Sequence, residues 1–220
     1  MSGHSHFAES TEEYLEAVYR LEREGPGVTT SGLASDLGVA PASVSGMLKK
    51  LASEGYLEYV ARGEVKLTQS GLEIAVRVVR RHRLAECLLT NVLGMPWDEV
   101  QSEACMLEHA ISQRVEDRLV ALLGDPQTCP HGQPIPPSDL SDPARTGTPL
   151  AQIEQGTQAL VSGVTEEIPE MLRYLGDVGL RPGTQVRVVD KAPLGGPITI
   201  EIAGARHAIS LELARMVMVA

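Results

Sequence analysis

The stretch TTSGLASDLGVAPASVSGMLKKLAS, residues 29–53, decides the fold of the amino-terminal part of the chain. Its first residues predict a short helix that ends at Gly38, because glycine often follows the last turn of a helix. Pro41 predicts the start of a second helix, which continues to about Glu54, because proline favours the first helical position. Two short helices joined by a tight turn form a helix-turn-helix, the motif that this stretch predicts.

The sequence on both sides of this motif predicts a winged domain. Apolar residues recur with a helical period over residues 10–23, which predicts a helix before the motif. After the motif, residues 56–60 and 65–68 alternate between apolar and polar side chains, as in two strands joined by a short turn. We therefore expect residues 1–73 to form a winged helix-turn-helix domain that binds DNA.

The second helix of a helix-turn-helix enters the major groove and presents its first residues to the base edges. Small side chains there approach thymine methyl groups closely, and lysines one turn later lie where phosphates would be. Residues 41–52 contain two lysines and no acidic residue, in a chain whose net charge is −10. The alternative is a three-helix unit that contacts protein. The predicted DNA contacts are Ala42, Ser43, Ser45, Gly46, Lys49 and Lys50, with Arg62 between the two strands.

The composition agrees with a protein of the cytoplasm. The 220 residues are 43% hydrophobic and 22% charged, and no apolar run reaches the ~18–20 residues of a membrane span. Three cysteines are too few for a secreted disulfide framework, and the amino terminus lacks the pattern of a secretory signal. Aromatic residues, at 3%, are too scarce for the stacking platforms of single-strand and RNA binders. We therefore expect no membrane partner and no secretion.

Beyond residue 73 the sequence predicts two further folded regions with a linker between them. Helical periods through residues 74–124 predict helices that pack on one another. Residues 125–149 contain seven of the chain's 14 prolines, which predicts a linker or an irregular strap. Short strand patterns within residues 150–220 predict a small β-barrel. The expected fold class is therefore α+β.

One of the predicted helices carries a cluster of potential metal ligands. Cys105, Glu108 and His109 are spaced i, i+3 and i+4, so their side chains lie on one helix face. A thiolate, a carboxylate and an imidazole are ligands for a divalent transition metal. Two further pairs with helical spacing occur elsewhere in the chain, although each pair alone is also common on exposed helix surfaces. They are His82 with Glu86, and Glu13 with Glu16.

Six short motifs occur in order along the chain. They are TEEYL at 11–15, VS at 44–45, LTQSG at 67–71, HRLAE at 82–86, EACMLEH at 103–109 and HGQPIP at 131–136. Through them the sequence resembles the family of the diphtheria toxin repressor and the manganese transport regulators, which are metal-activated bacterial transcription repressors. The resemblance covers nearly the entire chain. It implies a helical dimerisation and metal-binding domain at 74–124 and a carboxyl-terminal SH3-like module at 150–220, related to modules of ferrous-transport proteins.

The resemblance also implies a primary metal site. Its ligands would be Cys105, Glu108 and His109, completed by Glu13 from the first helix. Iron-type members have methionine at the position of Glu13 and manganese-type members have aspartate, whereas Cys105 is the iron-type residue. The set is therefore a hybrid, and we expect one or two Mn²⁺ or Fe²⁺ ions per subunit.

Two alternatives are open for the second ion. In the manganese type, the residues matching Glu16 and His82 hold it close to the first ion. In the iron type, an ancillary site combines helical residues with two ligands from the SH3-like module. The iron-type candidates are His82, Glu86, Gln101, Glu167 and Glu170, of which Gln101 stands where the family has a histidine.

We therefore expect a repressor that controls manganese or iron homeostasis. A shared ion would join the DNA-binding domain to the dimer domain, and so fix the two reading helices of a homodimer on half-sites ~34 Å apart in a palindromic double-stranded operator. A hydrolytic or redox metalloenzyme is the main alternative, because Cys, Glu and His ligands also serve catalysis. A metal buffer or transport accessory is a third. Cys129 and His131 could form another ligand pair, but in a proline-rich strap we favour a structural role for both.

Overall fold

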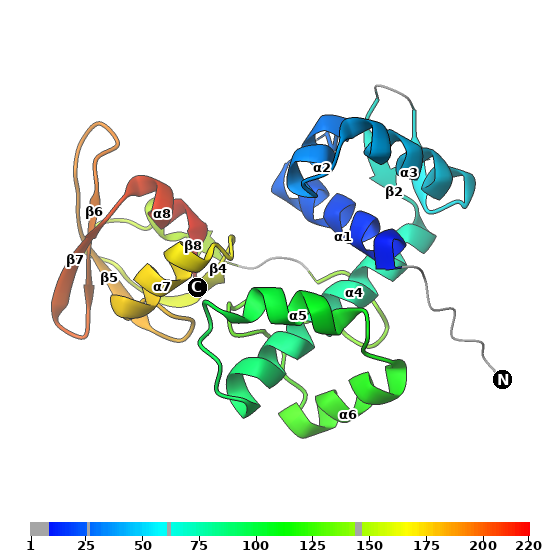
Figure 1. Cartoon of the computed structure of the whole chain (residues 1–220). Coiled ribbons are helices and arrows are strands. Elements are labelled where there is room, and N and C mark those ends of the chain that lie inside the picture. Colours follow the sequence, from blue (N-terminus) through cyan, green and yellow to red (C-terminus); the bar gives the residue numbers. More distant parts are fainter. Residues whose placement is uncertain (1–8, 26, 61–62, 144–146) are drawn as a thin grey trace. The chain divides into compact units, whose positions relative to one another are not determined.

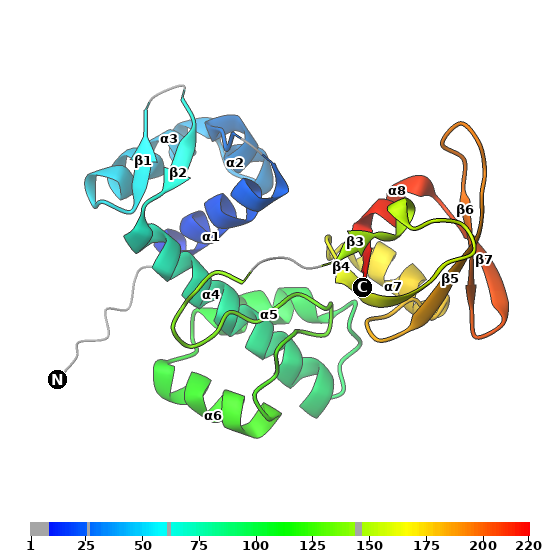
Figure 2. The same cartoon turned by 180° about the vertical axis from the view of Figure 1, so that it is seen from behind.

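The computed structural model describes residues 9–25, 27–60, 63–143 and 147–220. The chain forms two compact units, and Figures 1 and 2 show its elements from opposite sides. The first unit contains residues 1–81 together with 108–111 and 136–142, and the second contains the rest. Among the described residues, no helix is long and apolar enough to cross a membrane.

Three helices and a two-stranded wing form the first unit, together with the start of a fourth helix. The Thr29 hydroxyl caps the second helix by accepting a hydrogen bond from the Gly32 N–H, and Pro41 opens the third. These observations confirm the predicted winged helix-turn-helix. The elements are α1 (Glu9–Glu24), α2 (Thr30–Asp36), α3 (Pro41–Ser53), β1 (Leu57–Tyr59), β2 (Val65–Leu67) and α4 (Gln69–Cys87).

The core of the first unit combines aliphatic side chains with two buried tyrosines, Tyr14 and Tyr19. On α3, Val44, Leu48 and Leu51 are fully buried, and this i, i+4, i+7 spacing leaves the opposite face of the helix in solvent. The start of α4 lies against the wing, where a Cβ on Gly71 would be 2.1 Å from the carbonyl oxygen of Tyr56. Only glycine allows this close approach.

The second unit begins with helices and continues into an irregular strap. Ser112 caps α6 through its hydroxyl, and Gly124 ends it in the left-handed conformation. Residues 125–135 follow as a strap, in which Thr128 forms an antiparallel bridge with Pro134. Cys129, His131 and Gln133 of the strap are buried, so this segment is packed into the unit. The helical elements are the end of α4, the π-helical turn η1 (Leu88–Val92), α5 (Val100–Glu108) and α6 (Gln113–Leu123).

The rest of the second unit is an antiparallel sheet with two short helices. The strand order is β3-β8-β4-β5-β6-β7, and strand β6 alternates buried and partly buried residues, as expected for a sheet with one face on the core. The elements are β3 (Thr148–Pro149), η2 (Leu150–Gln152), β4 (Gln158–Val164), α7 (Pro169–Asp177), β5 (Gln185–Lys191), β6 (Ile198–Ile202), β7 (Ala205–Ile209), α8 (Leu211–Met216) and β8 (Val217–Val219).

Candidate metal centres and DNA-reading helix

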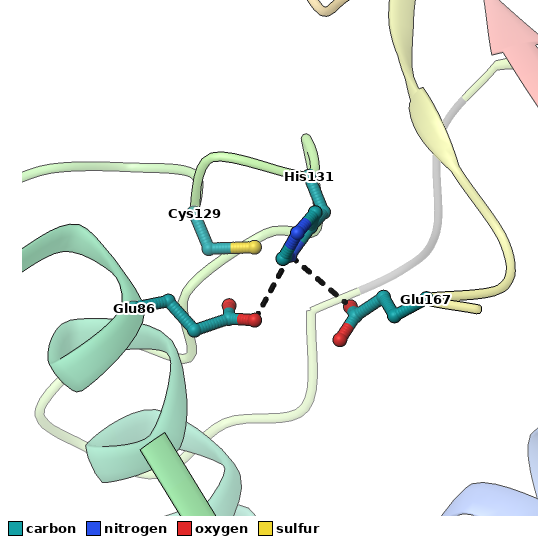
Figure 3. Close-up of side chains that lie close together, drawn as sticks. All are labelled: Glu86, Cys129, His131 and Glu167. Atoms are coloured by element: carbon teal, nitrogen blue, oxygen red, sulfur yellow. Dashed lines mark ion pairs between the residues drawn. The ribbon is translucent and has the colours of Figure 1, made fainter. Parts of the chain in front are cut away.

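Four potential ligands from three segments of the second unit converge on one point (Figure 3). Glu86 lies near the end of α4, and Glu167 lies between β4 and α7. Cys129 and His131 lie in the strap. One ligand atom from each residue lies within 4.8 Å of the other three, and only Glu167 is even partly exposed. We call this group, Glu86 with Cys129, His131 and Glu167, the strap cluster.

Tight backbone contacts hold the strap in place. The Gly132 N–H donates to the Cys129 carbonyl oxygen at 2.9 Å, which closes a turn. Gly132 has a φ of +82°, and a Cβ there would lie 2.0 Å from the carbonyl oxygen of Ser162 in β4. The Val164 N–H donates to the His131 carbonyl oxygen at 3.0 Å. The strap therefore lies directly against β4, the strand that leads to the fourth residue of the cluster.

The charges within the strap cluster are strongly coupled. Burial favours the protonated form of Glu86, but the rings of His131 at 2.9 Å and His82 at 3.5 Å outweigh it and hold its pKa below the ordinary value. Burial lowers the pKa of His131, but Glu86 and the charge of Glu167 together raise it to about 9. Burial and the charge of Glu86 raise the pKa of Glu167. The cluster thus places a buried carboxylate and imidazolium beside a second carboxyl group.

This donor set fits a divalent transition metal. A thiolate, an imidazole nitrogen and carboxylate oxygens are the ligands that such ions use. In the described part of the chain, both carboxylate oxygens of Glu86 and Nδ1 of His131 make no hydrogen bond of suitable geometry, which is rare for buried polar atoms. Burial, followed by the charges of Glu86 and Glu167, raises the pKa of the Cys129 thiol well above its ordinary value. A cation among these groups would offset the negative charge and favour the thiolate.

A second group of potential ligands lies in the first unit. Glu9 and Glu13, one turn apart on α1, and His109 each place a ligand atom within 4.8 Å of the others, and we call this group the α1 cluster. His109 Nδ1 lies 2.7 Å from the Glu12 carboxylate and its Nε2 lies 3.2 Å from Glu108. The hydrogen bond with Glu12 outweighs burial and raises the pKa of His109. The α1 cluster is more exposed than the strap cluster.

Three further predicted ligands lie together in the second unit. His82 Nε2 is 3.1 Å from the Gln101 side-chain oxygen, and His82 Nδ1 is 4.0 Å from the Cys105 sulfur. Cys105 is exposed and lies one turn before Glu108 on α5. Gln101 therefore contacts the His82 ring, as a residue that orients a ligand does.

Two predicted ligands lie apart from these groups. Glu16 is half-buried on α1, and Glu170 is exposed in the first turn of α7. Among the residues that the structure describes, neither belongs to a group of three or more potential ligands.

Sequence reasoning missed three members of the two clusters. Glu9 lies just before the helix predicted over residues 10–23 and was not named as a ligand, whereas α1 begins at this residue. For Cys129 and His131 the sequence favours a structural role over a ligand pair, whereas the strap folds back on α4 and β4 and places both among the potential ligands of the strap cluster. The available signal was a cysteine and a histidine two residues apart, followed by Gly132, which supplies the positive φ of the turn.

The predicted DNA-reading residues lie on α3. Ala42, Ser43 and Gly46 are exposed, and Ser45 donates a hydrogen bond to the Pro41 carbonyl oxygen at 2.9 Å. Lys49 and Lys50 are also exposed one turn further along the helix. Arg62 lies outside the described residues.

In the comparison with known proteins, three family models match three successive parts of the chain. Family models match for the N-terminal DNA binding domain of iron dependent repressors over residues 6–65, their metal binding and dimerisation domain over 68–137, and the FeoA domain over 148–220. The iron-dependent repressor IdeR of Mycobacterium tuberculosis is 35% identical over 209 residues, which cover 89% of this chain and 90% of that protein. The chain belongs to the iron-dependent repressor family.

Further relatives and a solved structure support the assignment of this repressor to the family. The diphtheria toxin repressor of Corynebacterium diphtheriae is 30% identical over 223 residues, or 96% of each chain. The solved structure of a manganese-dependent transcriptional repressor in complex with manganese has a TM-score of 0.88 and 35% identity, and covers 96% of this chain and 99% of that one. These findings confirm the α+β fold class with its SH3-like FeoA domain. They also confirm a metal-dependent, DNA-binding, homodimeric transcriptional repressor, so the metalloenzyme alternative is wrong.

Five exposed apolar side chains belong to the dimerisation domain of the repressor, which matches over residues 68–137. Exposed apolar residues are candidates for a contact surface. The five are Val92 and Leu93 at the end of η1, Met106 on α5, and Val115 and Leu122 on α6.

Proposed function

We propose that Mn²⁺ or Fe²⁺ activates this repressor through two sites in each subunit, and that it acts in the cytoplasm on a palindromic operator. One site is the strap cluster. The other is built around Glu13 and His109 of the α1 cluster, with Glu108 at the end of α5 as a further ligand. The observation that carries the proposal is the strap cluster itself, a buried set of thiol, imidazole and carboxyl groups whose ligand atoms lie within 4.8 Å of one another.

The strap cluster supports a combination that differs from both alternatives for the second ion. It contains Glu86 and Glu167 of the iron-type set, together with two strap residues that neither alternative included. His82 lies 3.5 Å from Glu86 and would orient it as an outer partner, and Gln101 contacts His82 in turn. Carboxylates favour Mn²⁺ and Fe²⁺, whereas the sulfur of Cys129 also admits Zn²⁺, which binds such sites more tightly. Selection between these ions would then depend on geometry and on their supply.

The second site would join the first helix of the DNA-binding domain to the end of α5. His109 donates from Nδ1 to Glu12, which leaves Nε2 as the ligand nitrogen, in the way that metal-binding histidines are usually held. A divalent ion supplies the positive charge that carboxylates at this point require. With α1 held, the first residues of α3 (Ala42, Ser43, Ser45 and Gly46) would meet base edges, and Lys49 and Lys50 the phosphates, in both half-sites of the operator.

The test is operator binding under anaerobic conditions, which protect Fe²⁺ and the thiols from oxidation. A palindrome is first selected from random double-stranded DNA at saturating Mn²⁺, and its affinity is then measured against Mn²⁺, Fe²⁺ and Zn²⁺ concentration. We expect His131→Gln, Cys129→Ser and His109→Gln each to raise the half-maximal Mn²⁺ concentration by about 10–100-fold or more, since loss of an outer partner already costs this much.

Glu167→Gln and Glu170→Gln form a matched pair for this titration, because both residues come from the same region and only Glu167 lies in the strap cluster. We expect the Glu167 variant to weaken activation and the Glu170 variant to leave it unchanged. Equal effects would favour the iron-type ancillary set over the strap cluster. Activation unchanged in the variants of Glu167, His131 and Cys129 would refute a metal site there.

A further inference from the structure

Trp97, the only tryptophan of the chain, lies between the metal-binding helices and the FeoA domain. It belongs by sequence to the matched dimerisation domain, at residues 68–137, in the segment just before α5. Its side chain is nevertheless 3% exposed, in the hydrophobic core that strands and helices of the FeoA domain form, with Leu150, Val161 and Leu172 among the partners. Trp97 therefore fixes the FeoA domain against the segment that carries it.

Trp97 also contacts a residue of the strap cluster directly. Its carbonyl oxygen accepts a hydrogen bond from His131 Nε2 at 2.7 Å. Because a carbonyl oxygen only accepts, Nε2 carries a proton and Nδ1 is the nitrogen that faces Glu86. The indole ring stacks on the imidazole with centroids 5.6 Å apart and planes inclined at 29°. Main chain and ring together thus set both the tautomer and the orientation of His131.

The segment that follows Glu167 also contacts the indole ring. A Cβ on Gly176, in α7, would lie 3.1 Å from the indole Nε1, so this position must be small. The Arg181 guanidinium lies 4.9 Å from the ring centroid, in a cation–π contact. Next to Trp97, Asp98 pairs with Arg173 of α7 at 3.2 Å. Since α7 begins two residues after Glu167, the docking of Trp97 on α7 determines where Glu167 lies.

We propose that Trp97 is a positioning residue of the strap cluster, which brings His131 and Glu167 together by docking the FeoA domain onto the strap. The proposal rests on the metal site proposed above. According to this proposal, the contact of Trp97 with the FeoA domain determines how His131 of the strap and Glu167 of the FeoA domain are placed relative to each other.

The test compares Trp97→Leu with Trp97→Phe in the full chain, by calorimetric titration with Mn²⁺. The indole Nε1 has no hydrogen-bond partner within the described residues, so phenylalanine keeps the stacking and loses nothing that was bonded. We expect Trp97→Leu to weaken the strap site by about 10–100-fold, as loss of an outer partner does, and Trp97→Phe to restore most of the affinity. Binding at the α1 cluster serves as the internal reference and should stay unchanged. Equal affinity of the strap site in wild type and Trp97→Leu would overturn the proposal.

A double-mutant cycle with Glu167→Gln tests whether Trp97 acts through Glu167. If it does, the second substitution weakens Mn²⁺ binding less in Trp97→Leu than in the wild-type background. Fully additive losses would show that Trp97 does not position Glu167. Ile200→Ala is the control for general destabilisation, because Ile200 is fully buried in the same core on β6. It should lower the melting temperature without a comparable loss of Mn²⁺ affinity, and a loss as large as that of Trp97→Leu would reduce Trp97 to an ordinary core residue.

Fluorescence of the wild-type chain keeps the proposal testable if Trp97→Leu does not fold. With one tryptophan, the emission reports on Trp97 alone. Mn²⁺ should change it along the same saturation curve as calorimetric binding to the strap site, and His131→Gln should abolish the change. An emission that stays constant through saturation would contradict the proposal. If instead His131→Gln and Cys129→Ser leave the number of bound ions unchanged, it is the proposed metal site that fails.

Discussion

His131 carries a charge that its neighbours create. Because the Glu86 carboxylate and the charge of Glu167 outweigh burial and raise its pKa to about 9, the ring holds two protons near neutral pH. Coordination through Nδ1 must release one of them, and the Cys129 thiol, whose pKa burial also raises, must release another.

The sign of the pH dependence follows directly. Protons compete with the cation below the pKa of His131, so Mn²⁺ affinity of the strap site should rise by at least about tenfold per pH unit as the pH approaches 9. Calorimetry at pH 7 in buffers of different ionisation enthalpy gives the number of protons released. Cys129→Ser should release about one fewer than wild type. Affinity independent of pH over this range would mean that His131 is not a ligand.

Glu12 is the corresponding partner at the other site. Its carboxylate lies 2.7 Å from His109 Nδ1 and raises the pKa of that histidine. Glu12→Gln should lower the pKa of His109, seen in an NMR titration, and weaken Mn²⁺ binding at the α1 cluster by about tenfold. Arg20→Gln is a suitable control, since Arg20 lies on the same helix and pairs with Asp36 at 2.7 Å. A His109 pKa that does not move would exclude this role for Glu12.

The sequence predicted those ligands that share a helix face and missed those that meet only in space. The i, i+3, i+4 spacing of Cys105, Glu108 and His109 predicts a common helix face. In the structure α5 ends at Glu108, and His109 lies with Glu9 and Glu13 instead of with Cys105. Cys129 and His131 become ligand candidates only when the strap reaches Glu86, through contacts between residues far apart in the chain. Local periodicity contains no information about such contacts, and the proline-rich composition predicts a linker or an irregular strap without indicating what it contacts.

At the scale of elements, the sequence predicted the long helices more completely than the short strands. The predicted helix over 10–23 agrees with α1, and the one from Pro41 to about Glu54 agrees with α3, because each repeats its apolar period over several turns. Strands β3 and β8 were missed because, unlike the equally short β1 and β2, they are not neighbours in the sequence joined by a short turn. The strap has no period at all, and its shape depends on single residues such as Gly132.

A substitution at Gly132 therefore tests whether the strap packs closely against β4. Alanine there would combine a strained positive φ with a Cβ that lies 2.0 Å from the Ser162 carbonyl oxygen, so the strap must separate from β4. Gly132→Ala should cost clearly more than the ~1–2 kcal/mol of the strain alone, and should weaken Mn²⁺ binding at the strap cluster. Gly156 has a φ of +86° with open space around its Cβ position, so Gly156→Ala measures the strain by itself. Thermal unfolding that ranks the two variants equally would contradict the close contact.

At the scale of the whole molecule, an acidic chain must bind a polyanion. The net charge of −10 opposes association with DNA, and the lysines of α3 supply only a local attraction. Specific binding then depends on contact with both half-sites at once, because a dimer that joins two weak half-site contacts binds the operator more tightly than either contact alone. The dimer is thus as necessary for operator binding as the reading helix itself.

The need for a dimer can be tested at the exposed apolar side chains of the dimerisation domain. Leu122 on α6 is 62% exposed, and Leu122→Asp should make the repressor monomeric in sedimentation equilibrium, because a buried unpaired carboxylate at a dimer contact is costly. Operator affinity at saturating Mn²⁺ should fall by about 100-fold or more, while Mn²⁺ binding to each subunit persists. Leu194→Asp is the matched control, since Leu194, between β5 and β6, is 105% exposed and lies outside the dimerisation domain. A Leu122→Asp protein that stays dimeric would place the interface elsewhere, and a monomer with undiminished operator affinity would show that simultaneous reading of two half-sites is unnecessary.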